Sequence, residues 1–443
     1  MNKLFIKSIR PLLEAVGLCQ KEGLLVGRVC GSFSRKEYLS QQELNHHVHI
    51  LGASGFGKTV LLSKILKDQL KKGQGALLLD QKGDREDMNA LIDEVRKLGR
   101  LQDLQTFSLS HEGLFGHYNV IADGNATELR DRIIDSFNWS EEFYKNQSMG
   151  YLLKLMTALC YLRDQHGWQV DLHSVYQGLS SADFLRDICL AIPSAEAKVK
   201  TLAEECYKYL SDRALAGNLS GLKVQLESLL ITSFGDYLKS NEHGINLFKA
   251  VNERKIVFIF LDTRRYRIAG PSLAKFILRD LIATSSRIDA EIPKAQRKPF
   301  VCFIDEFADI GSEEFTSFPD RARSSKMSLV LSHQELSDLK KVSETFAARL
   351  TGNISTLYAF LQSNSESAEA IAARAGTRSV MKVTERTSRF LWWQIRTGER
   401  SEREVEEYRV HPNVIKSLRV GECVVVKKYP EARSHVIKVS TDS

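Results

Sequence analysis

The sequence has 443 residues, of which 43% are hydrophobic and 26% are charged. This is the composition of an ordinary globular protein, and the length allows two or three domains or one large α/β domain with an insertion. The formal net charge of +7 fits a nucleic-acid partner and a solvated basic surface equally well.

Cysteine spacing and hydrophobic runs exclude further classes of protein. None of the seven cysteines stands at a C-x-x-C spacing, which indicates a reducing cytoplasm rather than a disulfide scaffold or a zinc site. His46, His47 and His49 are close in sequence, but neighbours on a strand point to opposite faces, so we predict no metal site there. No run approaches the ~18 apolar residues of a membrane span. We therefore expect no transmembrane segment and no signal peptide.

Strands and helices are predicted to alternate on both sides of a helical stretch. After a segment of mixed type at 1–45, we expect strands at 46–51, 76–79 and 105–109, with helices at 58–72 and 85–98 between them. Later strands are expected at 256–261, 300–304, 328–331, 356–361, 423–427 and 435–439. This alternation predicts an α/β fold with a mainly parallel sheet and helices on both faces.

The stretch from about Asn125 to Ser240 differs from the rest of the chain. Its apolar residues recur at helical spacing, as in the stripe Leu152, Leu155, Met156, Leu159 and Leu162. We predict an all-α insertion at 125–240. It would divide the α/β domain into a first part at 46–124 and a second part with a C-terminal segment at 241–443, preceded by the N-terminal segment at 1–45.

A glycine-rich motif follows the first predicted strand and opens the first helix. Residues 52–59 read GASGFGKT and match G-x-x-x-x-G-K-[ST], in which backbone N–H groups and the helix N-terminus hold phosphates. The lysine reaches the β- and γ-phosphates, and the threonine binds Mg²⁺. The predicted ligands of ATP and Mg²⁺ are Gly52, Ser54, Gly55, Gly57, Lys58 and Thr59. The α/β domain is thereby predicted to be a nucleotide-binding domain.

Polar side chains end two later strands. Asp305 and Glu306 follow the predicted strand at 300–304. We expect Asp305 to hold Mg²⁺ and Glu306 to activate the attacking water, which would make the protein an ATPase. A strand that merely ends in solvated acids is the alternative. Gln334 follows the next strand and is expected to contact the γ-phosphate or the water, although glutamine after a strand is a common pattern.

In this order and spacing, the motifs resemble the additional-strand ATPases of the RecA/FtsK/HerA type. More narrowly, they resemble the coupling proteins of conjugation and type IV secretion, the TraD and TraG group. The resemblance covers most of the chain, and its segments are 49–59, 80–84, 305–307, 321–334, 353–362, 366–376, 406–412 and 415–425.

The resemblance implies a hexameric, ATP-hydrolysing ring motor with a RecA-like domain. Such motors deliver DNA with its relaxase, or effector proteins, to a secretion channel, and their all-α insertion faces the substrate. The resemblance also implies that Arg323 completes the ATP site of a neighbouring subunit; the alternative is a solvated cation at a helix end. Family members usually have an N-terminal membrane anchor, and we expect none here. The implied location is the cytoplasm, or the inner-membrane periphery through an anchoring partner or the channel.

Two basic clusters and two other functions stay open at this stage. The cluster Arg264–Arg267 follows a strand and fits a phosphate-backbone contact and a solvated loop equally well. The basic stretch at 378–403 surrounds aromatic residues, but interleaved glutamates favour an ordinary surface or a subunit interface over DNA contact. The alternative functions are a soluble DNA translocase of the HerA/FtsK kind in repair or defence, and a recruitment platform for which ATP is an assembly switch.

Overall fold

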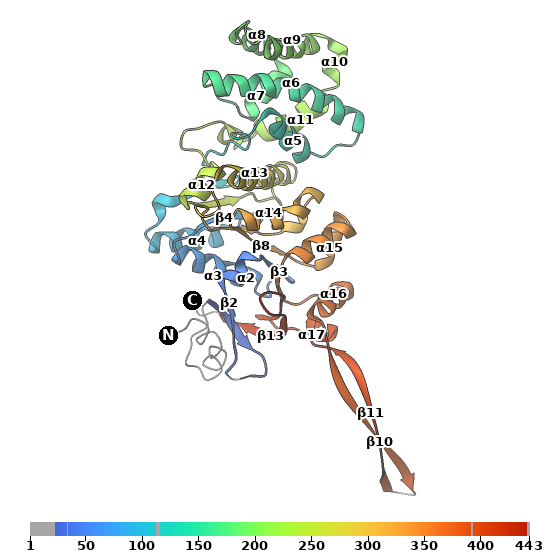
Figure 1. Ribbon diagram of the computed structural model, residues 1–443. Coiled ribbons are helices and arrows are strands. Elements are labelled where there is room, and N and C mark those ends of the chain that lie inside the picture. The colour runs from blue at the N-terminus through green and yellow to red at the C-terminus, as the bar shows by residue number, and fades with distance from the viewer. Residues whose placement is uncertain (1–22, 33, 112–115, 391–392, 441–443) are drawn as a thin grey trace. The chain divides into compact units, whose positions relative to one another are not determined.

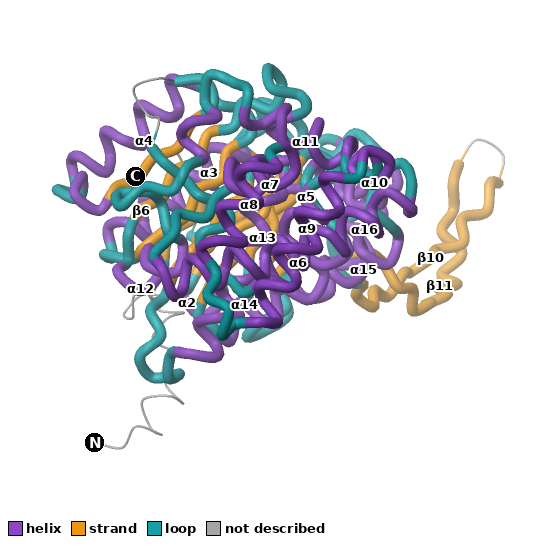
Figure 2. Tube along the Cα trace, turned by 90° about the horizontal axis from the view of Figure 1, so that it is seen from above, coloured by secondary structure: helices purple, strands orange, loops and turns teal. Residues whose placement is uncertain are grey.

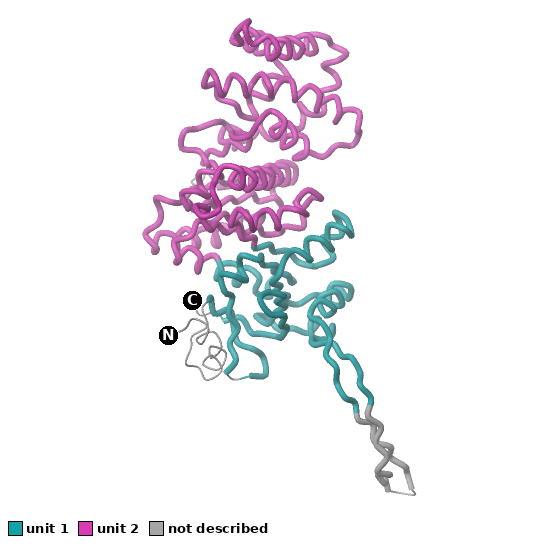
Figure 3. The backbone as a smooth tube through the Cα atoms, viewed as in Figure 1, with its two compact units in different colours: residues 1–65, 330–443 teal, residues 66–329 magenta. Residues whose placement is uncertain are grey.

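The computed structural model describes residues 23–32, 34–111, 116–390 and 393–440, and the side chains in these ranges except those at 383–402. The chain forms two compact units (Figure 3). Unit 1 holds residues 1–65 and 330–443, and unit 2 holds residues 66–329. The boundaries fall within helix α3 (Lys58–Lys71) and strand β8 (Met327–His333). The four-part division at 45, 124 and 240 stays a prediction.

Unit 1 is built on a sheet in which strands from both ends of the chain are neighbours. The strand order is β2-β1-β13-β12-β9-β3-β8. β3 runs parallel to β8 and β9, and the other pairs are antiparallel. The remaining bounds are β1 (Leu24–Val29), β2 (Lys36–Leu39), β3 (Val48–Leu51), β9 (Thr356–Ala359), β12 (Glu422–Lys427) and β13 (Arg433–Val439). Sequence analysis gives residues 1–45 only a mixed character and misses β1 and β2. β2 pairs with β1, and β1 is joined to the rest of the sheet by β13, at the other end of the chain.

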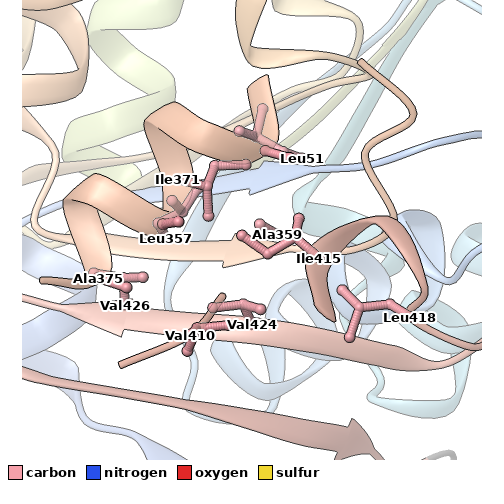
Figure 4. Packing of buried hydrophobic residues seen from close by; sticks show 12 residues of the cluster. Leu51, Leu357, Ala359, Ile371, Ala375, Val410, Ile415, Leu418, Val424 and Val426 are labelled. Atoms are coloured by element: carbon pink, nitrogen blue, oxygen red, sulfur yellow. The ribbon is translucent and has the colours of Figure 1, made fainter. Parts of the chain in front are cut away.

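Two helices of unit 1, α16 and α17, pack on the sheet around an apolar cluster (Figure 4). Leu357 and Ala359 of β9 are two residues apart and share one face of the sheet, as do Val424 and Val426 of β12. They meet Ile371 of α16 in this cluster. The helices and 3₁₀ turn of this unit are α2 (Gln41–Asn45), η6 (Leu336–Lys341), α15 (Glu344–Asn353), α16 (Ser365–Ala375) and α17 (Pro412–Lys416).

A buried charge cluster joins β2 and α2 to the last two strands. The side chain of Lys427 is 0% exposed, and its Nζ lies 2.7 Å from Glu37 and 2.9 Å from Glu43. Arg433 lies 2.6 Å from Glu43, and His435 lies 2.9 Å from Glu37. Burial alone would raise the pKa of Glu37, but hydrogen bonds and charges from His435, Lys427 and Arg433 lower it to about 2. The cluster therefore stabilises unit 1 while Glu37 is ionised.

Replacing Lys427 with Met is expected to lower the free energy of unfolding by about 3 kcal/mol, because two buried carboxylates lose a fully buried cation that contacts both of them. Urea denaturation followed by circular dichroism at pH 7 measures this loss. Because the folded-state pKa of Glu37 is depressed, its contribution is present above its ordinary value of 4.5 and is lost as the pH falls toward 2. The exposed neighbour Lys428 supplies the control Lys428→Met, and equal losses in the two variants would contradict the assigned role of Lys427.

β10 (Thr377–Phe390) and β11 (Trp393–Tyr408) form a two-stranded sheet of their own. The antiparallel ribbon runs from Thr377 opposite Tyr408 to Phe390 opposite Trp393 (Figures 1 and 2). Sequence analysis does not predict this hairpin within the basic stretch at 378–403. The side chains at 383–402 lie outside the described residues, so the role of that stretch stays a prediction.

Unit 2 contains a parallel sheet with the order β7-β4-β6-β5. β6 and β7 are buried at every position, as continuous apolar runs predict for strands covered on both faces. The bounds are β4 (Gly75–Asp80), β5 (Leu104–Ser108), β6 (Ile256–Phe260) and β7 (Phe300–Ile304). The helices and 3₁₀ turns around them are α4 (Arg85–Lys97), η1 (Leu101–Asp103), α12 (Leu247–Glu253), α13 (Ala269–Glu291), η4 (Phe307–Asp309), η5 (Glu313–Ser317) and α14 (Phe318–Ser324).

The described regular elements between β5 and α12 are helices and one 3₁₀ turn. They are α5 (Ala126–Ser136), α6 (Glu142–His166), α7 (Leu172–Ser180), α8 (Ala182–Ala191), α9 (Ala197–Ser211), α10 (Arg213–Gly217), α11 (Ser220–Leu230) and η3 (Gly235–Leu238). Asn125 caps the start of α5 by accepting from the backbone N–H groups of Thr127 and Glu128.

Within unit 2, α13 lies between these helices and the strands β4 and β6 (Figure 1). A buried ion pair of 2.9 Å joins Arg132 of α5 to Asp280 of α13. Phe137, which follows α5, makes an edge contact with Phe276 of α13. The first helix of the insertion, α5, therefore packs on α13 and shares a core with the α/β part of unit 2. The helices α6 to α11 lie on the side of α5 that faces away from α13 (Figure 1).

The predicted strands at 256–261, 300–304 and 423–427 match β6, β7 and β12 to within one residue at either end. β8 is longer than its predicted range of 328–331, and β9 ends at Ala359 instead of at 361. β3 begins at Val48 and not at His46, because His47 has a φ of +66°, which no strand residue adopts.

Candidate functional site

The glycine-rich turn at 52–57 connects β3 to α3 in unit 1. Gly52, Gly55 and Gly57 have φ angles of +148°, +81° and +115°, a region that favours glycine. A Cβ atom at Gly52 would lie 2.4 Å from the Cβ of Phe360. The predicted P-loop therefore has the backbone that its glycines allow, and no larger residue fits at its first position.

The ends of the two strands beside β3 hold this loop. The N–H of Gly52 donates to the carbonyl of Gln334 at 2.9 Å, and the N–H of Ala53 donates to the carbonyl of Leu361 at 3.0 Å. The loop is thus fixed to the carboxyl ends of β8 and β9, where ligands of open α/β sheets bind.

The side chains predicted to bind phosphates and Mg²⁺ differ in their exposure to solvent. Lys58 is buried, and its Nζ donates to the carbonyl of Gly52 at 2.5 Å. Ser54 and Thr59 are exposed, so their polar atoms are accessible to a ligand. Lys58 and Thr59 are the first residues of α3, whose N-terminus favours anions.

Gln334 has an exposed side chain at the end of β8, as predicted. Sequence analysis misses Gln362, which is 0% exposed. The Nε2 of Gln362 donates to the carbonyl of Gln334 at 2.9 Å, and its Oε1 accepts from the N–H of Leu336 at 3.2 Å. Gln362 therefore fixes the backbone on both sides of the β8 terminus. The only sequence signal for it is a polar residue directly after an apolar strand.

Two buried histidines connect the P-loop strand to β8. The Nε2 atoms of His49 and His333 lie 2.7 Å apart. Burial, with a contribution from the charge of His333, lowers the pKa of His49 well below its ordinary value. The pair therefore joins β3 to β8 by a hydrogen bond between two buried side chains inside the sheet. His46 stacks instead on Tyr429 at 3.9 Å, and the described residues contain no group of three or more potential metal ligands among His, Cys, Asp and Glu.

Asp305 and Glu306 follow β7 at the carboxyl edge of the sheet in unit 2. Glu306 has the left-handed angles φ 50° and ψ 41°, which are uncommon for a residue other than glycine. Its N–H donates to the Oδ1 of Asp305 at 3.0 Å. The turn presents both carboxylates at the strand end, as the sequence predicts.

The turn after β4, at Asp80–Gly83, surrounds this acid pair. The Nζ of Lys82 lies 2.7 Å from Asp305 Oδ2 and 3.1 Å from Glu306 Oε1. The Nε2 of Gln81 donates to the backbone carbonyls of Asp305 at 2.9 Å and Glu306 at 2.8 Å. Sequence analysis notes this turn only as a family segment and misses both contacts.

Negative charge is concentrated at this edge of the sheet. Burial and the neighbouring Asp305 raise the pKa of Asp80 to about 6. Burial alone would lower the pKa of Lys82, but the charges of Asp305 and Glu306 raise it above its ordinary value. Oxygen donors in an acidic setting are what Mg²⁺ prefers.

The predicted arginines lie on exposed parts of unit 2. Arg323 lies near the end of α14, with its side chain 39% exposed and 3.4 Å from Asp320. In the loop after β6, Arg264, Arg265 and Arg267 are exposed, and Arg265 lies over the ring of Tyr266 at 5.4 Å. Both positions are accessible to another molecule, so the proposed contacts of these arginines stay predictions.

Comparisons with known proteins show which group of proteins this chain resembles. A family model described as the TraM recognition site of TraD and TraG matches residues 299–419. The type 4 coupling protein DotL of Legionella pneumophila is 21% identical over an alignment 406 residues long, and the match covers 78% of this chain and 51% of DotL. The chain is a relative of the type IV coupling proteins. It spans about half the length of DotL.

Solved structures share the fold of this coupling-protein relative. The unbound bacterial conjugative coupling protein TrwB superposes with a TM-score of 0.67 at 14% identity, over 96% of this chain and 91% of TrwB. TrwB in complex with ADP and Mg²⁺ gives 0.64 at 15% identity, over 96% and 90%. The predicted fold class, α/β with a mainly parallel sheet and an inserted all-α domain, is confirmed. Among the described residues, no helix is long and apolar enough to cross a membrane.

Proposed function

We propose that this coupling-protein relative is an ATP-hydrolysing motor that recruits DNA with its relaxase, or a protein substrate, and delivers it to a type IV secretion channel. The observation that carries the proposal is the P-loop at 52–59, in its strand–loop–helix setting, in a chain related to the coupling proteins. TrwB, whose fold this chain resembles, binds ADP and Mg²⁺.

The residues of the loop and of the β7 terminus fit Mg²⁺ and ATP chemically. The positive-φ glycines let backbone N–H groups converge on phosphates. Lys58 would contact the β- and γ-phosphates, and the Thr59 hydroxyl and the Asp305 carboxylate are the hard oxygen donors that Mg²⁺ takes. Bound Mg²⁺ would neutralise developing charge on the phosphate oxygens.

Catalysis would then depend on three further side chains. Glu306 would accept a proton from the attacking water. The exposed side chain of Gln334 would orient that water or contact the γ-phosphate. The exposure of Arg323 supports its proposed contact with the ATP site of a neighbouring subunit in a homo-hexamer.

The substrate and its partners are proposed to bind outside the ATP site. The helices α6 to α11 carry no predicted catalytic residue, and they include the exposed apolar side chains Phe143, Leu190 and Val224. We propose that these helices recognise the cargo or its adaptor. Attachment to the inner membrane would come through the channel or an anchoring partner, with the chain itself in the cytoplasm.

Replacing residues 140–230 with a Gly/Ser linker is expected to abolish substrate recruitment while basal ATPase activity is retained. The linker leaves the Arg132–Asp280 pair and the Phe137–Phe276 contact in place, so α5 keeps its packing on α13. Pull-down from the native cell, a transfer assay and ATP hydrolysis measure the three properties.

A second variant avoids any loss of folding. Phe143→Ser with Leu190→Ser changes side chains that are 56% and 75% exposed, and it is expected to weaken recruitment without affecting hydrolysis. If transfer persists at the wild-type level in both variants, the helices are structural and this part of the proposal is wrong.

A further inference from the structure

The ammonium of Lys82 contacts the carboxylates of both Asp305 and Glu306. It bridges Asp305 and Glu306 at 2.7 Å and 3.1 Å. The two carboxylate side chains are 10% and 14% exposed, whereas the Lys82 side chain is 29% exposed. One positive charge is therefore shared by two poorly solvated negative charges, and its own side chain still reaches solvent.

The backbone that presents Lys82 is held on every side. Its N–H donates to the Asp80 Oδ1 at 2.6 Å. On one side Gln81 is 2% exposed and binds the carbonyls of Asp305 and Glu306. On the other, Gly83 has a φ of +66°, and a Cβ there would lie 2.8 Å from the Cβ of Asp262. The turn thus fixes the start of the lysine side chain beside the acids and leaves only its flexible stem to move.

We propose that Lys82 is a positioning residue for Glu306 and a competitor of Mg²⁺ for Asp305. The inference rests on the proposed ATPase function. While Asp305 carries no metal ion, Lys82 holds both carboxylates. When Asp305 takes Mg²⁺, Lys82 releases it and keeps Glu306, whose side chain stays oriented.

Electrostatics predicts how removal of the Lys82 ammonium changes Mg²⁺ binding and ATP hydrolysis. Removing one positive charge near three carboxylates, those of Asp80, Asp305 and Glu306, makes the site more negative and favours a divalent cation. The same change removes a charge-assisted hydrogen bond from Glu306. A variant without the ammonium should therefore bind Mg²⁺ more tightly and hydrolyse ATP more slowly, a combination that a merely structural lysine would not produce.

The test compares Lys82→Met and Lys82→Arg with a matched control. Lys255 has a similarly exposed side chain, at 28%, and it pairs with Asp103 at 3.6 Å outside the predicted machinery. Melting temperature is followed against MgCl₂ alone, without nucleotide, at constant ionic strength set with NaCl. The concentration of Mg²⁺ that gives half of the stabilisation is expected to fall about tenfold in Lys82→Met and to stay at the wild-type value in Lys255→Met and Lys82→Arg.

The double variant Lys82→Met with Asp305→Asn tests whether Asp305 is the residue that binds Mg²⁺. Its melting temperature is expected no longer to change with the MgCl₂ concentration. ATP turnover at saturating Mg²⁺ is expected to fall in Lys82→Met and to be largely restored in Lys82→Arg. If Lys82→Met does not fold, Lys82→Gln replaces it in the same comparison.

An unchanged Mg²⁺ midpoint in the variants that lack the charge overturns the inference, as does equal turnover in Lys82→Met and the wild type. If the wild-type protein hydrolyses no ATP while the Mg²⁺ midpoint still shifts in Lys82→Met, the proposed function fails, but the competition between Lys82 and Mg²⁺ stands.

Discussion

Lys58→Ala is expected to weaken ATP binding about a thousandfold, because a buried cation that faces the phosphates is removed and nothing replaces its charge. Lys58 is 6% exposed, so water compensates only part of that loss. Titration with a fluorescent ATP analogue in the presence of Mg²⁺ measures the change in Kd.

The control for Lys58→Ala is Lys71→Ala, which removes an exposed lysine at the other end of α3 and should bind ATP like the wild type. A Kd for Lys58→Ala within threefold of the wild type would contradict the P-loop assignment.

The Lys58→Ala variant also tests the role of Arg323. Mixed with Arg323→Ala, it should recover part of the hydrolysis if Arg323 acts across a subunit interface. No recovery in mixtures shown to co-assemble would assign Arg323 to the surface.

Glu306→Gln is expected to keep ATP binding and to lower turnover by about a thousandfold, because an amide cannot accept the proton of the attacking water. The amide has nearly the same shape, and the left-handed backbone at Glu306 is held by Gln81, so the fold should be retained. Steady-state phosphate release and nucleotide affinity, measured on one preparation, separate the two steps.

Glu313→Gln is the matched control for Glu306→Gln, since Glu313 is an exposed glutamate a few residues further along the chain. Its turnover should equal that of the wild type. Hydrolysis by Glu306→Gln at the wild-type rate would mean that another group is the base. Loss of binding together with turnover would mean that Glu306 supports the site instead of acting on water.

The predictable parts of the site have signals contained in a few neighbouring residues. The P-loop requires glycines at positions whose φ is positive, and Gly52, Gly55 and Gly57 have that backbone. Asp305 and Glu306 are found from sequence because a continuous apolar run ends at them, and such a run gives a strand that is buried on both faces. The all-α insertion can be predicted because its apolar residues recur at helical spacing.

Sequence by itself therefore determined the fold class, the approximate positions of the core strands along the chain and the local motifs of the candidate site. Tertiary structure alone decided which residues support those motifs. Lys82 reaches Asp305, His49 meets His333, and β1 pairs with β13, each across a long separation in sequence. Such contacts leave no periodic signal, because they depend on which strands become neighbours in a sheet. That choice is made by the burial of whole elements and not by the side chains that later touch.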